Sequence, residues 1–458
     1  MAYLFHTEAD RREMLESIGA DSIQAIIDGQ VPESVQMQRP LDLPEALGEL
    51  GLENELRRLA GLNASASSHA CFMGAGAYDH FIPAAVDEIA SRGEYYTSYT
   101  PYQAEVSQGN LQVMFEYETL MTQLTGLGVS NASLYDGGSA ATEGVLMALA
   151  AGRKRNKVIT SDAIHPEYRE ILQAYLVNIG ATLTVVETSE VGTSEAILNA
   201  VDEDTACVLI QHPNFYGRLE DVASICEASH AAGALVVQSF DPISLGLLKR
   251  PGDLGVDIAI AEGQCLGNPL QFGGPYLGIM ACREDLVRRL PGRIAGQTSD
   301  RRGKRCWVLT LQTREQHIRR EKATSNICSN QTLLALRASI YLSLLGPHGL
   351  QETATHCLQK TEYARRELEQ LERFELVHQG SVFKEFLVRD LAGDVPGLLA
   401  QLEDRGIMAG VSLSQFNEQL HGRHNDCFLV AVTEKRTKQE IDGLVSALRE
   451  ASSLTTTC

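Results

Sequence analysis

Short apolar runs alternate with amphipathic stretches through the middle of the chain. Between residues 157 and 282 the apolar runs fall at 158–160, 183–186, 207–210, 235–237, 258–260 and 277–280. The stretches 167–178, 194–201 and 221–232 between them carry apolar residues at helical spacing. Strands that are apolar on both faces and joined by helices predict a mainly parallel sheet covered on both sides. The pattern therefore predicts an α/β domain.

The two ends of the chain follow other patterns. The N-terminal residues are mostly polar, with apolar positions at helical spacing. After residue 330, two long helical stretches at about 330–345 and 350–371 precede short alternating segments and a last helix at about 438–449. We therefore predict three parts: a helical N-terminal segment over 1–65, a large α/β domain over 66–330, and a smaller C-terminal α+β domain over 331–458.

Composition and charge narrow the function. The chain has 458 residues, of which 44% are hydrophobic and 21% charged, as in a folded globular protein. Its formal net charge of −20 repels phosphate backbones and anionic lipids, so we expect no nucleic-acid and no membrane partner. The N-terminus lacks the apolar core of a signal peptide. Ten scattered cysteines without a C-x-x-C pair favour reduced thiols and a cytoplasmic protein.

A Gly-Gly turn precedes an apolar helix in the first candidate site. Gly137 and Gly138 free the backbone to bend, and Ser139 is expected to cap the helix that follows. The first turn of such a helix presents unpaired N–H groups that suit a phosphate. The alternative is an ordinary capped helix. His165 is a second candidate, because it falls between a strand and a helix, where an imidazole can stack on a flat ring; the alternative is a polar loop residue.

The segment 212–241 has the layout of the large domain of pyridoxal-phosphate enzymes. In those enzymes one strand ends in an Asp that pairs with the pyridine nitrogen, and the next carries the Schiff-base lysine. Here no lysine lies between Asp257 and Arg283, and Gln264 and Cys265 stand where it is expected. Gln238 or Ser239 falls at the Asp position, with Asp241 close by. We expect a relic cleft that binds no cofactor in this chain alone, formed by Ser139, His165, Gln238, Gln264 and Cys265.

Two further segments carry candidate contact residues. Tyr95, Tyr96, Tyr99, Tyr102 and Gln103 fall in an irregular stretch that Pro101 interrupts. Such tyrosine-rich stretches favour contact surfaces and ligand walls, and the alternative is a loop packed by its own aromatic rings. The second segment, 314–322, is basic within an acidic protein and includes Arg314 and His317. It suits either an anion site or a solvated helix face. We expect no metal site.

These motifs resemble one family over essentially the whole chain. The specific runs are 74–83, 96–109, 131–136, 262–269 and 314–328. They are similar to the glycine dehydrogenase (decarboxylating) P-proteins of the glycine cleavage system, and most of all to the alpha-type chains, subunit 1, of two-subunit P-proteins. The resemblance implies the fold type I of pyridoxal-phosphate-dependent transferases, with an aspartate aminotransferase-like large domain.

The resemblance also implies an explanation for the missing lysine. In such P-proteins a similar partner chain, subunit 2, carries pyridoxal phosphate on its lysine, and the active site lies between the two chains. The implied reaction is decarboxylation of glycine and transfer of the aminomethyl group to the lipoyl arm of H-protein, an oxidoreductase activity of the complex alone. The candidate catalytic residues are then Tyr95, Tyr96, Tyr99, Tyr102, Gln103, Arg314 and His317.

Two other functions remain open from the residues. One is a free-standing pyridoxal-phosphate aminotransferase or decarboxylase, which the missing lysine disfavours. The other is a purely structural partner whose cleft is empty. Activity of the chain on mixing with subunit 2 distinguishes the structural partner from the catalytic one.

Overall fold

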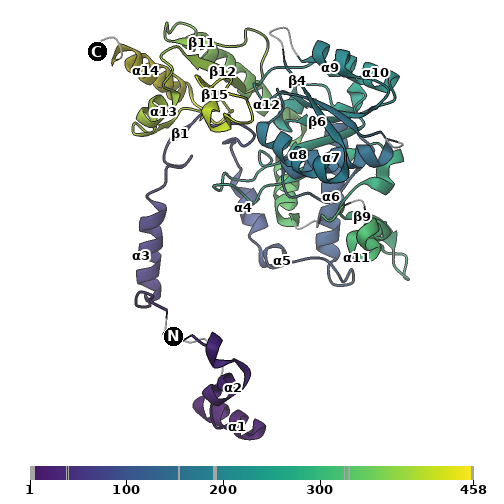
Figure 1. Ribbon diagram of the computed structural model, residues 1–458, viewed down its shortest axis with the longest axis vertical. Helices are drawn as coiled ribbons and strands as arrows, with labels where there is room; N and C mark the ends of the chain where they lie inside the picture. The colour runs from purple at the N-terminus through teal and green to yellow at the C-terminus, as the bar shows by residue number, and fades with distance from the viewer. Residues whose placement is uncertain are drawn as a thin grey trace. The chain divides into compact units, whose positions relative to one another are not determined.

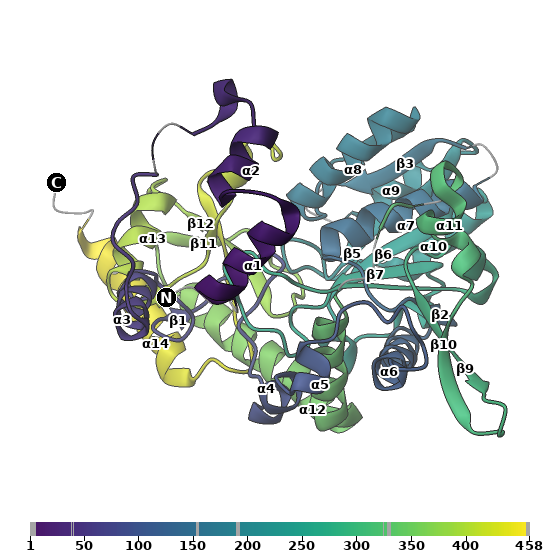
Figure 2. The same cartoon turned by 90° about the horizontal axis from the view of Figure 1, so that it is seen from below.

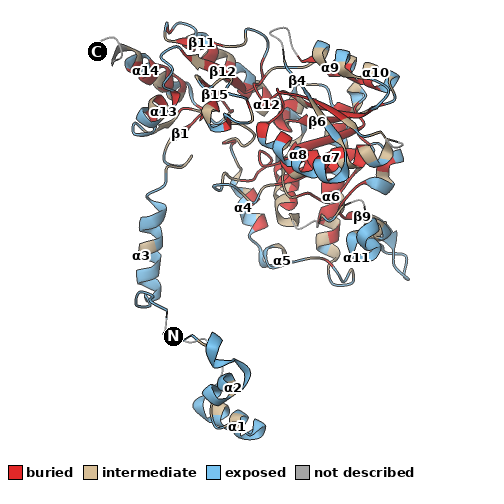
Figure 3. Ribbon diagram, viewed as in Figure 1, coloured by how far each residue is buried: buried red, intermediate tan, exposed pale blue. Residues whose placement is uncertain are grey.

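The computed structural model describes residues 6–37, 39, 41–152, 155–188, 193–323, 325–327 and 331–454. Contacts divide the chain into two units, Met1–Asn63 and Ala64–Cys458. The first unit contains the helices α1 (Glu8–Ile18), α2 (Ile23–Gln30), η1 (Glu33–Val35) and α3 (Glu49–Ala60). Thr7 and Asp10 form a capping box at α1. Within the described part of these helices no residue is buried, as the pale colour in Figure 3 shows.

A twisted sheet forms the centre of the second unit (Figures 1 and 2). Its strand order is β2 (Val129–Ser130), β8 (Gly278–Cys282), β7 (Ile258–Glu262), β6 (Leu235–Phe240), β5 (Thr205–His212), β3 (Lys157–Ser161) and β4 (Thr182–Val186). From β7 to β4 the neighbouring strands are parallel, whereas β8 is antiparallel to both of its neighbours. The expectation of a mainly parallel sheet is confirmed.

Helices cover both faces of this sheet, as the two-sided apolar strands require. Alternate residues of β7 show the arrangement. Ile258 and Ile260 pack in a core with α7 (Gly137–Ala151) and α8 (Pro166–Ile179). Ala259 and Ala261 pack in another core with α6 (Gln108–Thr125) and α12 (Thr332–Leu368). The helices α9 (Ser194–Ala200) and α10 (Val222–Ala231) pack in a third core with β3, β5 and β6.

Shorter elements connect and border the sheet. A hairpin of β9 and β10 stands apart from it (Figure 2). The short elements are α4 (Ala84–Ala90), α5 (Gly93–Tyr96), η2 (Ile243–Gly246), η3 (Pro251–Leu254), η4 (Glu284–Arg289), β9 (Ile294–Ser299), β10 (Arg305–Thr310), η5 (Gln312–Arg314), α11 (Gln316–Arg319) and η6 (Arg320–Lys322).

A second, antiparallel sheet forms the C-terminal part. Its order is β11 (Phe374–Leu376), β12 (Glu385–Asp390), β15 (Cys427–Ala431) and β14 (Val411–Ser412). Its other elements are α13 (Val395–Glu403), η7 (Leu413–Phe416), α14 (Lys438–Leu454) and the parallel pair of β1 (Ala70–Cys71) with β13 (Ile407–Met408). The two long helices expected after residue 330 form one element, α12, which is kinked at Gly346 before Pro347.

By length and composition alone, α12 could cross a lipid bilayer. A core helix of a globular protein can have the same length and apolar composition, and α12 packs as such a core helix does. Ala335, Ala338 and Tyr341 lie in the core beneath the central sheet, and Ala364 and Leu368 lie in the core of the C-terminal part. The first core continues past the kink at Gly346 to Leu350, Ala354 and Cys357.

The C-terminal part is joined directly to the loop after β5. The backbone N–H of Phe383 donates to the carbonyl of Gly217 over 2.9 Å, and Arg218 and Val382 form an isolated bridge. Gly217 adopts a φ of +83°, and a Cβ there would lie 1.8 Å from the carbonyl oxygen of Glu385. The close approach of the two parts therefore requires glycine at this position.

We expect Gly217→Ala to destabilise the protein by several kcal/mol, because the added methyl group overlaps the Glu385 backbone. Gly180→Ala is the matched control, since Gly180 also has a positive φ, of +66°, but faces open space. The control should cost about 1–2 kcal/mol, the penalty of a left-handed backbone alone. Urea unfolding measures both, and equal losses would show that the contact with Glu385 is unimportant.

Candidate functional site

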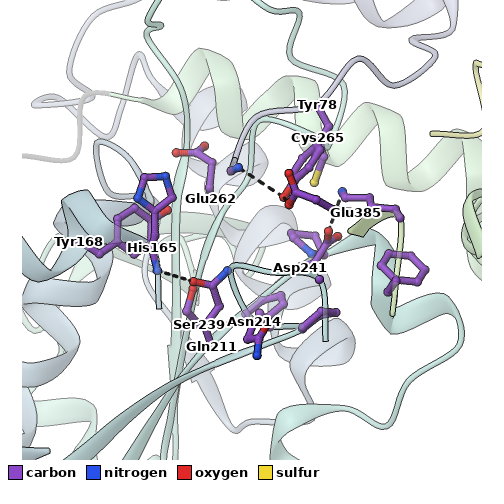
Figure 4. Close-up of a pocket in the computed structure, with 17 residues that line it drawn as sticks. Tyr78, His165, Tyr168, Gln211, Asn214, Ser239, Asp241, Glu262, Cys265 and Glu385 are labelled. Atoms are coloured by element: carbon purple, nitrogen blue, oxygen red, sulfur yellow. Dashed lines mark hydrogen bonds and ion pairs between the residues drawn. The ribbon is translucent and has the colours of Figure 1, made fainter. Parts of the chain in front are cut away.

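A small cavity lies at the carboxyl ends of β5, β6 and β7, where open α/β sheets bind ligands. The C-terminal part closes it with Phe383, Lys384 and Glu385. The space that the centre of a water molecule can reach is about 50 Å³, enough for a few waters. Figure 4 shows its side chains converging, with Tyr168 and His165 on one side, Asp241, Cys265 and Glu385 on the other, and Glu262 between them.

His165 stacks on an aromatic ring of this chain. Its ring centroid lies 4.7 Å from that of Tyr168, with 18° between the ring planes. Burial lowers the pKa of His165 to about 4, so the imidazole is neutral near pH 7. The His165 Nε2–H donates to the carbonyl of Ala75 over 2.9 Å, and Nδ1 accepts from the backbone N–H of Glu167. Both ring nitrogens are therefore used within the protein.

Asp241, just after β6, binds the ammonium of Lys384 from the C-terminal part. Its Oδ2 lies 2.6 Å from the Lys384 Nζ, and its Oδ1 accepts backbone N–H groups of η2. The ammonium also lies 3.7 Å from the centroid of the Tyr78 ring and donates to the Nε2 of His80 over 3.1 Å. Burial opposes the charge on Lys384, but the attraction of Asp241 raises its pKa overall, so the amine is protonated.

Glu262, at the end of β7, lies against the first turn of α7. Its Oε2 accepts the backbone N–H of Gly137 over 2.9 Å, and its Oε1 accepts those of Gln264 and Leu277. Burial raises the pKa of Glu262 to about 7, and these three hydrogen bonds partly offset that rise. A carboxyl group of this chain therefore takes one N–H group, that of Gly137, from the helix turn that the sequence suggested for a phosphate.

The predicted relic residues do not all meet in this cavity. His165 and Cys265 line it. Gln264 is buried beside it and binds the backbone of Tyr78 through both ends of its amide. Gln238 is fully buried inside β6, which continues to Phe240, so Ser239 and Asp241 line the cavity and Gln238 does not.

Ser139 is not the cap of α7, contrary to the sequence-based expectation. The helix begins three residues earlier than that cap implies, at Gly137, and Asp136 is its N-cap, accepting the backbone N–H of Ser139 over 2.7 Å. An aspartate carboxylate can accept this bond from the N-cap position, and two glycines are tolerated in the first turn. Ser139 instead lines a separate cavity of about 260 Å³ beside Glu143.

The buried Arg293 links the tyrosine segment to the basic segment. The guanidinium carbon of Arg293 lies 5.9 Å from the ring centroid of Tyr102, and its Nε lies 4.0 Å from Glu315, which in turn lies 3.6 Å from His317. The side chains of Tyr96, Tyr99 and Tyr102 are 67%, 80% and 77% exposed. Tyr95 is half-buried and Gln103 is exposed.

Arg314 is committed to the fold of this chain. Its guanidinium donates to the backbone carbonyls of Leu290, Gly292 and Leu311. Burial lowers its pKa. Arg314 therefore holds the chain beside Arg293 and Glu315 in place, rather than presenting free donors to a substrate.

Among the described residues, one cluster brings potential metal ligands together: His80, Cys357 and Glu434. His80 donates from Nδ1 to Glu434 over 2.6 Å and accepts from Lys384 at Nε2. The neighbouring ammonium supplies the positive charge that a metal ion would bring. The cluster is therefore explained as an ion-pair network.

The chain is similar to known proteins over almost its full length. Residues 1–448 match the family described as glycine cleavage system P-protein. The chain belongs to this family. A probable glycine dehydrogenase (decarboxylating) subunit 1 of Carboxydothermus hydrogenoformans is 49% identical over 98% of this chain and 99% of its own. Its counterpart in Desulforamulus reducens is 46% identical over 98% and 99%.

Solved structures agree with this assignment. The crystal structure of a glycine decarboxylase (P-protein) in inhibitor-bound form has a TM-score of 0.90 and 42% identity, covering 98% of this chain and 100% of that one. A glutamate decarboxylase of Lactobacillus brevis has a TM-score of 0.68 at 14% identity over 93% and 97% of the chains, a likeness of fold alone. The P-protein subunit described here thus has the fold type I of pyridoxal-phosphate enzymes, as the sequence predicts.

The cleft of this P-protein chain does not fit pyridoxal phosphate. No lysine lies between Asp257 and Arg283, and the lysine that lines the cavity, Lys384, is paired with Asp241. Side chains of both the sheet and the C-terminal part project into the cleft, and the space that the centre of a water molecule can reach there is only about 50 Å³. Sequence reasoning missed Lys384, Glu262 and Tyr168 because each fills the cleft through tertiary contacts. Asp241 and Glu262 had a local signal, because each lies at the end of a predicted strand, whereas Lys384 and Tyr168 had none.

We expect Asp136→Ala to lower the stability of this chain by about 1 kcal/mol, because the side chain that caps α7 is lost. Ser139→Ala should change stability by less than about 0.5 kcal/mol, since Asp136 accepts the Ser139 backbone N–H in either case. Denaturant unfolding of both variants measures the difference. A larger loss of stability in Ser139→Ala than in Asp136→Ala would show that Ser139 is the cap after all.

The buried Glu143 predicts a pH dependence of stability. Burial raises its pKa from 4.5 to about 7, and only one of its two oxygens has a hydrogen bond within the described structure, from Ser325. A carboxyl with a raised pKa in the folded state destabilises the protein as pH rises from about 4.5 to 7. We expect Glu143→Gln to be more stable than the parent by about 1–3 kcal/mol at pH 8 and by little at pH 5.

Unfolding curves at several pH values measure this effect. The exposed Glu88 gives the control variant Glu88→Gln, which should change stability little at any pH. A Glu143→Gln advantage as large at pH 5 as at pH 8 would contradict the assignment to charge burial.

Proposed function

We propose that this chain acts as subunit 1 of a two-chain glycine decarboxylase, together with a subunit 2 that carries pyridoxal phosphate on its own lysine. The complex removes carbon dioxide from glycine and transfers the remaining aminomethyl group to the lipoyl arm of H-protein. One observation carries the proposal: the cleft where the fold places the cofactor is closed in this chain, and its lysine is bound to Asp241. Catalysis then needs a second chain.

The cofactor on subunit 2 takes up the electron pair that remains on the substrate carbon when carbon dioxide leaves. This chain contributes residues that enclose the site. Tyr96, Tyr99 and Tyr102 expose most of their rings, and Tyr102 lies next to the cation of Arg293. Aromatic rings with hydroxyl tips suit a wall that excludes water and also orients polar groups. We place this wall at the contact with subunit 2, with His317 at its edge.

The free-standing aminotransferase or decarboxylase fits less well. Such an enzyme needs a neutral amine to bind the cofactor covalently. In the cavity of this chain the Lys384 amine is protonated by its pairing with Asp241. Borohydride reduction of the mixed complex with pyridoxal phosphate should therefore label subunit 2. A label on this chain within the cleft would contradict the proposal.

We expect Tyr96→Ala, Tyr99→Ala and Tyr102→Ala to slow glycine–carbon dioxide exchange by the complex about 10- to 100-fold each. Each loses a ring that is worth about 1–3 kcal/mol to the transition state. Matching Phe variants separate the hydroxyl from the ring. The stability of this chain alone should change little, because the three rings are exposed in it.

Tyr175→Ala is the matched control, because Tyr175 is 51% exposed on α8, away from this segment. It should leave exchange unchanged. Complex formation with subunit 2 is checked for every variant by sedimentation. Parental exchange rates in all three Ala variants, with the complex intact, would show that the tyrosines form no part of the site and would favour a purely structural role for this surface.

A further inference from the structure

We infer that three side chains of this chain occupy its cofactor-type cleft in place of a cofactor: the ring of Tyr168, the carboxyl of Glu262 and the ammonium of Lys384. Together they exclude pyridoxal phosphate independently of the missing lysine, and the Lys384 ammonium also joins the C-terminal part to the central sheet through Asp241. The occupation of the cleft is a property of this chain alone and does not depend on the partner.

The aromatic position is filled by Tyr168. An imidazole at the end of a strand, such as that of His165, offers its face to a flat ring. Here that face is covered by the Tyr168 ring at 4.7 Å and 18° (Figure 4). The phenol also reaches the start of α7, because a Cβ at Gly137 would lie 2.1 Å from the Tyr168 hydroxyl oxygen. One side chain therefore spans the distance from the histidine to the helix N-terminus.

The anionic position is filled by Glu262. The first turn of α7 points backbone N–H groups toward the cavity side, and the Glu262 carboxyl accepts the one from Gly137. Asp136 accepts another, from Ser139. Two carboxyl groups of the chain thus take the donors that an incoming phosphate would need. A phosphate that approached would also meet their negative charge.

The cationic position is filled by Lys384. Its ammonium lies 2.6 Å from Asp241, the carboxylate that faces the cavity from the end of β6. The lysine backbone has a φ of +43°, in the left-handed region that disfavours every residue except glycine. A lysine held in this conformation, with its side chain 1% exposed, indicates that the ion pair outweighs the backbone strain. The pair joins the C-terminal part to the sheet.

The first test removes the cation. Lys384→Ala should lower the thermal midpoint of the full chain by several degrees, because it leaves the Asp241 carboxylate unpaired. Methylammonium chloride should restore much of that loss, while sodium chloride at equal ionic strength should not. Lys157→Ala is the matched control, since Lys157 pairs with Asp202 over the same 2.6 Å but near the surface. If methylammonium did not raise the thermal midpoint of Lys384→Ala, or raised that of the control equally, the inference that the Lys384 ammonium fills the cleft would be overturned.

The second test removes the anion and uses a probe that cannot react with amines. Pyridoxamine 5′-phosphate and inorganic phosphate are titrated against the unaltered chain and against Glu262→Ala, and binding is followed by calorimetry. We expect no binding to the unaltered chain and binding of phosphate to Glu262→Ala. Glu284→Ala, at an exposed carboxylate, is the control and should bind neither.

The unaltered chain answers the question even if a variant fails to fold. Stoichiometric binding of pyridoxamine 5′-phosphate to it would show that the cleft is open and would overturn the inference. Failure of Glu262→Ala to bind phosphate would overturn the anionic part. The stability test and the binding test do not measure enzymatic activity. If the complex proved to be inactive, the two tests would still show whether the cleft is occupied.

Discussion

The ion pair of Lys384 and Asp241 is the contact on which the arrangement of the second unit depends. It joins the strand-end loop after β6 to the residue that precedes β12, and both charges are withdrawn from water. Removing one partner of such a pair typically costs about 3–5 kcal/mol, because the other charge stays buried. The surrounding groups are arranged to satisfy both charges, with η2 backbone donors on Asp241 and His80 accepting from Lys384.

This contact holds the C-terminal part against the central sheet of the second unit. Gly217 brings the loop after β5 within reach of the Glu385 backbone, and Phe383 donates to that loop. Fold type I enzymes place the cofactor in this cleft, yet here the cleft is part of the core packing. The rings of Tyr96, Tyr99 and Tyr102 are exposed on the surface of this chain, and Tyr102 lies beside the buried guanidinium of Arg293.

Much of the fold could be predicted because strands that are buried on both faces of a sheet appear in the sequence as continuous apolar runs. All six predicted strands are present, and five of them, β3 to β7, are the parallel members of the central sheet. The last, β8, is antiparallel, which periodicity cannot distinguish. The end of β6 was predicted too early, because Gln238 is polar and yet lies fully buried inside the strand.

The sequence by itself determined that no lysine lies between Asp257 and Arg283 and that a tyrosine-rich segment precedes α6, since both are matters of residue type at a known place. Only the tertiary structure decided what fills the cleft. Lys384 is separated from Asp241 by 143 positions, and no local pattern marks a lysine before a C-terminal strand as the partner of a carboxylate after β6. Their pairing follows from the closure of the two sheets on one another, which backbone periodicity cannot encode.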